Sequence, residues 1–243
     1  MTVLPNKNSE QSKKDQVEEM FNNISPKYDL LNHLLSANID KLWRKKAINL
    51  LKPWQPELIL DVATGTADFA IAATVIKGAK IVGIDISEGM LEVGRRKVEK
   101  KNLAEIIKLI KADSENLPFV NDKFDAAIVG FGVRNFENLK KGLSEIKRVL
   151  KPGGVFYILE FSKPVKSPYK QFYQFYFTRI LPFIGRMVSK DSTAYTYLPE
   201  SVNEFQDGEK FLTILAEVGF VENKCFSQTF GIASIYEAHK SLN

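Results

Sequence analysis

The segment ELILDVATGTADFAIAATVIKGAKIVGID, residues 57–85, decides the fold of this chain. Two short apolar runs, at 58–62 and 81–84, stand on either side of an alanine-rich stretch with helical character. This pattern predicts a strand, a helix and a second strand in one βαβ unit. Parallel strands need such a crossover, and ligands of open α/β sheets bind at the carboxyl ends of the strands. We therefore expect Gly65 and Asp85, which follow the two strands, to face one crevice.

The spacing between these two residues narrows the choice of ligand. An acid about 20 positions after a glycine turn is where a ribose diol is held. The turn at 63–67 has Gly65 as its one glycine, so a dinucleotide pyrophosphate fits it poorly. Asp61, Asp68 and Asp85 lie around the turn and favour a cationic nucleoside such as S-adenosylmethionine. In an ordinary βαβ unit these acids would only cap a helix and close a turn, and the loop alone leaves both interpretations open.

Composition excludes several other classes of protein. The chain has 243 residues, 44% of them hydrophobic and 26% charged, which suits one α/β domain with additions. No signal peptide or transmembrane span is expected, and the location is predicted to be cytoplasmic. A single cysteine, Cys225, excludes an internal disulfide, and His33 with His239 make no usual zinc site, so we expect no metal. The net charge of +5 is spread among acids, which argues against a nucleic-acid partner.

The remaining pattern gives the domain organisation. We expect a flexible tail at 1–15 and a single domain at 16–243, with an N-terminal helical cap at 16–52 and an inserted segment at 163–205 that faces substrate or membrane. Further strands are predicted at 106–110, 123–130, 155–161, 221–227 and 232–238, and helices at 88–101, 139–150 and 205–218. The last two strands are close enough in sequence to form an antiparallel hairpin.

Two strand ends carry candidate binding residues. After the third strand, Asp113 can accept a hydrogen bond from an exocyclic amine, with Ser114 beside it, although a simple turn closed by Pro118 is an equal alternative. After the fourth strand, GFGVRN places Arg134 and Asn135 near the crevice. The alternative is a purely structural role, with a helix cap at Asn135 and a surface ion pair at Arg134.

Two longer stretches resemble a known family. They are similar to the two signatures of the ubiquinone/menaquinone biosynthesis C-methyltransferases. The first stretch is YDLLNHLLS at 28–36, followed by Trp43, and the second is RVLKPGGVFYILEFS at 148–162. That family usually has methionine where Leu31 stands and histidine where Asp40 stands, and some members have serine in place of Gly130. The resemblance extends from about Val17 to the C-terminus.

The resemblance implies a fold and an activity. The fold would be a Rossmann-like, S-adenosylmethionine-dependent methyltransferase with a seven-stranded, mostly parallel sheet, an antiparallel C-terminal hairpin and N-terminal helices. The activity would be C-methylation of demethylmenaquinol, with a polyprenyl methoxy-benzoquinol as the alternative substrate. A nicotinamide-dependent oxidoreductase or a binding module is the rival class, and the missing glycines argue against it.

On this interpretation we assign hypothetical roles to individual residues. Asp85 would hold the ribose diol of the cofactor. Gly65 and Thr66 would meet the methionine moiety, and Asp113 with Ser114 would bracket the adenine. Arg134 would lower the pKa of the quinol while Asn135 orients a ring oxygen, and water or Asp40 would take the proton.

Residues 168–188 form the other informative stretch. Aromatic and aliphatic side chains lie on more than one face of a predicted helix at 172–184, but polar residues interrupt them, so the helix does not span a bilayer. Such a helix needs a second apolar partner. A polyprenyl quinol, a peripheral contact with the inner face of the cytoplasmic membrane, a second subunit in a homodimer and plain core packing all remain open.

Overall fold

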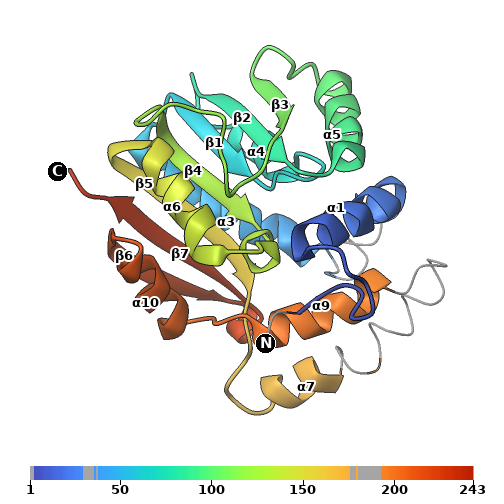
Figure 1. Cartoon of the computed structure of the whole chain (residues 1–243). Helices are drawn as coiled ribbons and strands as arrows, with labels where there is room; N and C mark the ends of the chain where they lie inside the picture. The colour runs from blue at the N-terminus through green and yellow to red at the C-terminus, as the bar shows by residue number, and fades with distance from the viewer. Residues whose placement is uncertain (1–2, 30–35, 37, 176–178, 180–192, 243) are drawn as a thin grey trace.

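A computed structural model describes residues 3–29, 36, 38–175, 179 and 193–242 of the chain. Its centre is a seven-stranded sheet with the strand order β3-β2-β1-β4-β5-β7-β6 (Figure 1). The strands are β1 Leu58–Val62, β2 Lys80–Asp85, β3 Ile107–Lys111, β4 Phe124–Gly130, β5 Leu150–Phe161, β6 Phe220–Gln228 and β7 Ala233–Lys240.

The direction of these strands confirms the predicted sheet. Neighbours from β3 to β5 pair in parallel, whereas β7 runs antiparallel to both β5 and β6. The chain leaves β1 toward β2 on one side and returns to β4 on the other. Between β1 and β4 the order of the sheet reverses, and open α/β sheets bind their ligands at such a switch point.

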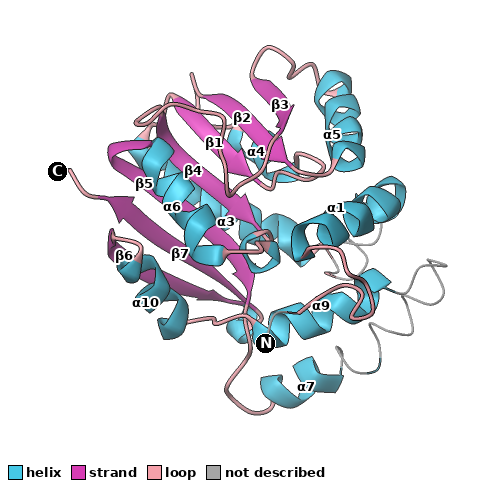
Figure 2. Cartoon of the chain, in the orientation of Figure 1, coloured by secondary structure: helices cyan, strands magenta, loops and turns pink. Residues whose placement is uncertain are grey.

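Alternate residues of the central strands enter two separate cores. In β4, Ala126 and Ile128 pack with α3 (Ile39–Leu51) and α4 (Asp68–Ala73), while Ala127 and Val129 pack with α6 (Leu139–Val149) and α10 (Glu209–Glu217). Figure 2 shows these helices covering the two faces of the sheet. The strands are apolar on both faces because helices cover both.

The first helix of the chain lies at the carboxyl ends of the strands. α1 (Lys13–Ile24) begins with Ser12 as its N-cap, followed by the short helix η1 (Ser25–Lys27). The helix therefore starts inside the stretch at 1–15 that we expected to be a tail. The capping hydrogen bond from the Asp15 amide to the Ser12 side chain sets this start.

Further boundaries differ from the prediction. β5 begins at Leu150 rather than at 155, because buried Leu150 pairs with Phe124 before a register shift, so KPGG is an irregularity within the strand. The C-terminal helix predicted at 205–218 is α10, which begins only at Glu209. Gly208 has a φ of +62° just before it.

The predicted segment 163–205 is described in part. It contains α7 (Tyr169–Phe175) and α9 (Thr193–Glu204), which Figure 1 shows near the N-terminus. α9 packs on α1 through Tyr197, Val17 and Met20. Most of the helix predicted at 172–184, and residues 30–35 of the first signature, lie outside the described residues.

Candidate active site

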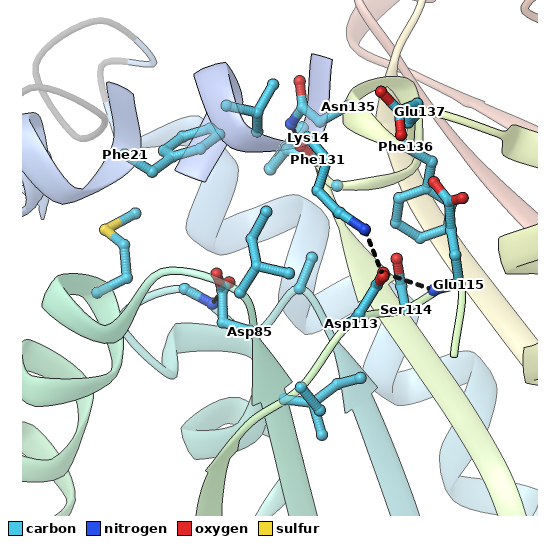
Figure 3. A pocket seen from close by; sticks show the side chains of 18 of the residues that line it. Lys14, Phe21, Asp85, Asp113, Ser114, Glu115, Phe131, Asn135, Phe136 and Glu137 are labelled. Carbon is cyan, nitrogen blue, oxygen red and sulfur yellow. Dashed lines mark hydrogen bonds and ion pairs between the residues drawn. The ribbon is translucent and has the colours of Figure 1, made fainter. Parts of the chain in front are cut away.

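A cavity lies between α1 and the carboxyl ends of the strands (Figure 3). Its walls come from α1, from the loops after β1, β2 and β3, and from the turn after β4. It is lined by Lys14, Val17, Phe21, Tyr28, Ala63, Gly65, Ile84, Asp85, Ile86, Met90, Ala112, Asp113, Ser114, Glu115, Gly130, Phe131, Gly132, Asn135, Phe136 and Glu137. The predicted residues Gly65, Asp85, Asp113, Ser114 and Asn135 thus share one cavity.

Asp85 links the loops that follow β1 and β2. Its Oδ2 accepts the Gly65 amide at 2.8 Å and its Oδ1 accepts the Ser87 amide at 2.9 Å. Burial raises the pKa of Asp85 to about 6, and these amides act in the opposite direction. Gly65 has a φ of +56°, which favours glycine at the turn.

Asp113 is joined to α1 in this structure. Its Oδ2 lies 3.1 Å from the Lys14 ammonium, and its Oδ1 accepts the Glu115 amide at 2.8 Å (Figure 3). Lys14 lines the cavity although the sequence placed it in the tail. Nothing in the sequence around Lys14 indicated that it would line the cavity.

The carboxylates around the first turn do not act together as expected. Asp68 forms an ion pair with Lys97, whose ammonium also lies 2.8 Å from Asp29. Thr66 donates to Asp29 at 2.5 Å. The charge of Asp68 is therefore balanced by the chain itself, which corrects the expectation that Asp61, Asp68 and Asp85 together attract a cation.

Asp61 lies behind the same turn, at the end of β1, and is fully buried. It accepts a hydrogen bond from the Thr64 hydroxyl at 2.6 Å. Burial raises its pKa to about 7, while the Thr64 bond and the Ala70 amide act in the opposite direction.

Arg134 and Asn135 belong to η3 (Val133–Asn135), which follows β4. Arg134 does not line the cavity; its Nη1 forms an ion pair with Glu160 Oε1 at 2.8 Å and also donates to the Phe131 carbonyl. The arginine side chain is 7% exposed, so the ion pair is buried rather than on the surface. Asn135 does line the cavity, and its Oδ1 is buried with no hydrogen-bond partner among the described residues.

Glu160 is a residue that the sequence did not single out. It ends the buried part of β5 and is fully buried, and burial raises its pKa. The sequence could have indicated a buried ion pair at this position, because Glu160 is an acid within the apolar run VFYILEF and buried charges are usually paired. The carboxylate of Glu160 therefore adds a negative charge beside Arg134.

Asp40 is not placed to act as a base. Its side chain is 1% exposed, accepts the Ser36 hydroxyl at 2.6 Å and forms an ion pair with Arg44. The spacing of four residues on one helix was the signal for this pair. A carboxylate held this way is poorly suited to take a proton from a substrate in the cavity.

Among the residues described, no three histidine, cysteine, aspartate or glutamate side chains gather where they could hold a metal ion. In the described part of the chain, no helix has both the length and the apolar character needed to cross a membrane.

Comparison with known proteins identifies close relatives. Residues 9–240 match the model of the ubiE/COQ5 methyltransferase family. The chain is 49% identical over 229 residues to a demethylmenaquinone methyltransferase of Bacteroides fragilis, covering 94% of each chain. It is 45% identical over 232 residues to the ubiquinone/menaquinone biosynthesis C-methyltransferase UbiE of Geobacter sulfurreducens, covering 95% of this chain and 90% of that one.

Solved structures share the fold at lower identity. A Thermotoga maritima S-adenosylmethionine-dependent methyltransferase, described as a possible histamine N-methyltransferase, has a TM-score of 0.65 at 19% identity and covers 92% of this chain and 99% of its own. The cyclase SpnF has a TM-score of 0.67 at 15% identity and covers 96% and 97%. Because these two proteins differ in reaction, their likeness shows the fold alone.

Proposed function

This chain belongs to the ubiE/COQ5 methyltransferase family, and on that premise we propose that it transfers a methyl group from S-adenosylmethionine to a ring carbon of demethylmenaquinol. It is an S-adenosylmethionine-dependent methyltransferase. Relatives named for demethylmenaquinone, at 42–49% identity over most of the chain, support the naphthoquinol as substrate. The UbiE relatives support a polyprenyl methoxy-benzoquinol of ubiquinone biosynthesis as the second candidate.

The cavity beside Asp85 is the observation that best supports the proposed cofactor. A nucleoside needs a carboxylate for its ribose diol and hydrogen-bonding groups for its base. Asp85 stands at the end of β2, and Asp113 and Ser114 stand after β3, all in one cavity. The apolar walls include Phe21, which suits the faces of an adenine ring.

The cofactor residues have separate tasks in this proposal. Asp85 accepts the ribose hydroxyls, and Asp113 with Ser114 brackets the adenine. Gly65 and Thr66 lie at the turn beside the methionine moiety. Asp113 becomes available to the adenine amine when Lys14 moves away from it, because both are donors to the same carboxylate.

The chemistry requires a nucleophilic ring carbon. S-adenosylmethionine would supply an electrophilic methyl group and leave as neutral S-adenosylhomocysteine. The ring carbon becomes nucleophilic when the neighbouring quinol hydroxyl loses its proton to water, and the hydrogen on that carbon is lost as a proton when the aromatic ring re-forms. Asn135 offers its Oδ1, which has no hydrogen-bond partner among the described residues, to orient that hydroxyl. Arg134 does not line this cavity, so the proposal requires the quinol to extend past Asn135 to the arginine Nε, which is buried with no partner among the described residues and would donate to the developing phenolate.

The Arg134–Glu160 ion pair changes how the arginine works. Glu160 balances the guanidinium charge, so Arg134 acts as an oriented donor and not as an isolated cation. We therefore place Arg134 and Asn135 as the residues that orient and stabilise the quinol, with Glu160 holding Arg134 in position.

A lipid-borne quinol also implies a contact with the bilayer. We propose peripheral binding of a cytoplasmic protein to the membrane through the region of α7. Phe175 at the end of α7 is 59% exposed, and Tyr169 at its start stacks on Phe230, which is 65% exposed. Exposed aromatic side chains of this kind enter the interface of a membrane. Flotation with liposomes tests this contact, and loss of binding in moderate salt without any effect of Phe175→Ser would contradict it.

Methyl transfer with purified protein tests the substrate. The protein is given S-adenosylmethionine with a deuterated methyl group and an equal amount of demethylmenaquinol or its methoxy-benzoquinol counterpart, each with the same prenyl chain. We expect the labelled methyl on the naphthoquinol, and only on the reduced form, because the quinone has no hydroxyl to ionise. Methylation of the benzoquinol alone would favour the second candidate, and methylation of neither would refute both.

A further inference from the structure

Three buried side chains at or beside the Arg134–Glu160 ion pair each keep one polar atom without a hydrogen-bond partner among the described residues. These atoms are Arg134 Nε, Asn135 Oδ1 and Tyr197 Oη. Buried polar groups almost always have a partner, so three such atoms in one region indicate a place where a polar ligand binds. The proposed chemistry uses the first two atoms and gives the phenol of Tyr197 no role.

Tyr197 belongs to α9, which is part of the segment predicted to face substrate. The residue is 3% exposed and packs on Val17 and Met20 of α1. Val17 also lines the cavity that contains Asp85. α9 contacts η3 as well as α1, and Figure 1 shows α9 close to α1. α9 therefore connects the wall of the cavity to the turn that carries Arg134.

The Arg134–Glu160 ion pair acts on this phenol. Burial raises the pKa of Tyr197 to about 12, and the charge of Arg134 lowers it while that of Glu160 raises it. The hydroxyl is therefore protonated at neutral pH and able to donate a hydrogen bond. Glu160 Oε1 already accepts Arg134 Nη1 at 2.8 Å and the Phe161 amide at 2.9 Å. No described residue accepts the phenol.

We propose that Tyr197 is a substrate-binding residue, which donates a hydrogen bond to the second ring oxygen of the quinol, the one that keeps its proton during methyl transfer. The inference rests on the proposed function, because it takes a ring with two hydroxyl groups as the substrate. It adds a contact from the segment at 163–205 to the contacts made by η3.

The shape of the substrate agrees with this arrangement. The two hydroxyl groups of such a quinol lie at opposite ends of one ring. Asn135 and Arg134 are proposed for the hydroxyl that ionises, which is next to the methylated carbon and therefore on the side of the cofactor. The second hydroxyl then points away from the cofactor, toward the helix that packs against η3, and Tyr197 places a buried donor there. A ring without that hydroxyl would leave the donor unpaired.

Two substrates that differ in one hydroxyl group test this contact. One is demethylmenaquinol, and the other is a naphthol with the same prenyl chain that keeps the hydroxyl beside the methylated carbon and lacks the second one. Methyl transfer to each is measured as kcat/KM with the full chain and S-adenosylmethionine. The two rings differ in intrinsic reactivity, so the ratio of the two kcat/KM values is compared between proteins, where that difference cancels.

Tyr197→Phe removes only the hydroxyl group. We expect kcat/KM to fall about tenfold for the quinol and to stay the same for the naphthol, because only the quinol loses a buried hydrogen bond. Tyr157→Phe is the matched control. The hydroxyl of Tyr157 lies 2.7 Å from Glu237 Oε2, and the residue does not line the cavity. This control should unfold at a lower urea concentration than the wild type and keep the wild-type ratio.

Binding measurements extend the test to the case in which Tyr197→Phe fails to fold. Calorimetry is done with the full chain saturated with S-adenosylhomocysteine. The wild-type protein should bind the quinol about tenfold more tightly than the naphthol, and folded Tyr197→Phe should bind the two alike. Equal affinity of the wild-type protein for the two rings would overturn the role of Tyr197 without any variant.

The outcomes separate this inference from the proposed function. Methylation of the quinol by the wild type, together with a wild-type ratio in Tyr197→Phe, would overturn the role of Tyr197 alone. An equal change of ratio in Tyr157→Phe would also overturn it, because the effect would then be common to the loss of any buried hydroxyl. A wild-type protein that methylates neither quinol would refute the proposed function and the inference with it.

Discussion

Two parts of the crevice hold their charges in different ways. In the half that we propose for the cofactor (the cofactor half), at the ends of β1, β2 and β3, Asp85 is held by backbone amides of Gly65 and Ser87. In the half that we propose for the substrate (the substrate half), at the ends of β4 and β5, Arg134 is held by the buried carboxylate of Glu160. The first arrangement leaves negative charge for a ligand that carries a cation, and the second arrangement is internally neutral, as a site for an uncharged quinol should be.

Removing one partner of the Arg134–Glu160 pair should have the largest effect. Arg134→Met leaves a buried carboxylate without its cation, so we expect the free energy of unfolding to fall by about 3–5 kcal/mol. The double change Arg134→Met with Glu160→Gln should restore most of that loss. Denaturant unfolding of both variants provides the measurement, and a single variant no less stable than the double one would refute the internally neutral substrate half.

The same two variants test the catalytic role. Turnover should fall on the order of 10²-fold in each, with S-adenosylmethionine binding retained, because an oriented donor to the phenolate is lost. Partial recovery at higher pH is expected, since more quinol then ionises without help. Normal turnover of the double variant at neutral pH would exclude Arg134 from the chemistry.

The cofactor half should respond to pH in the absence of ligand. The pKa values of Asp61 and Asp85 in the folded protein, about 7 and about 6, lie above the ordinary value of 3.8. A raised folded pKa means that the stabilising contribution is fully present below about pH 4 and is lost as the pH rises through about 6 to 7.

The free energy of unfolding should therefore fall over this range, with a slope approaching about 1.4 kcal/mol per pH unit for each group. Asp61→Asn should flatten the upper part of the curve, and this comparison is made by urea unfolding from about pH 4 to 8. A variant curve parallel to that of the wild type would show that Asp61 is not the buried group that titrates.

Cofactor affinity should have the opposite dependence on pH. In the proposed binding mode the ionised form of Asp85 accepts the ribose hydroxyls, so binding of S-adenosylmethionine should weaken as the pH falls below about 6. Asp85→Asn should weaken binding about tenfold near neutral pH and reduce this dependence. Calorimetry at several pH values measures both effects, and an unchanged affinity in the folded variant would remove Asp85 from the site.

The smallest effect is expected at the contact between α1 and the cofactor half. Lys14 pairs with Asp113 at 3.1 Å in a partly exposed setting, where such pairs contribute about 0.2–1 kcal/mol. Lys14→Met should strengthen cofactor binding by up to about fivefold, because the adenine no longer competes with the ammonium group. Lys111→Met is a matched control, since Lys111 pairs with Glu18 of α1 but does not line the cavity. Weaker binding in Lys14→Met would show that the lysine contacts the cofactor directly.

The sequence by itself determined the sheet and the places where the cofactor half lies. Apolar periodicity located the strands, Gly65 and Asp85 followed from the strand-end rule, and the two signatures indicated the family that the comparisons show. These features depend on residues that are neighbours in sequence or on a rule that holds for every parallel sheet. Their positions just after strands explain why five predicted residues line one cavity: Gly65, Asp85, Asp113, Ser114 and Asn135.

The tertiary structure alone decided which charges meet. Lys14 contacts Asp113 across 99 positions of the chain, and Arg134 contacts Glu160 across 26. Asp40, a candidate base from its place in the signature, is instead occupied by Arg44. Periodicity and spacing indicate which residues face the interior or end a strand. The partner of a buried charge depends instead on which distant element packs over that charge. That packing turned the expected lone cation at Arg134 into half of a buried ion pair.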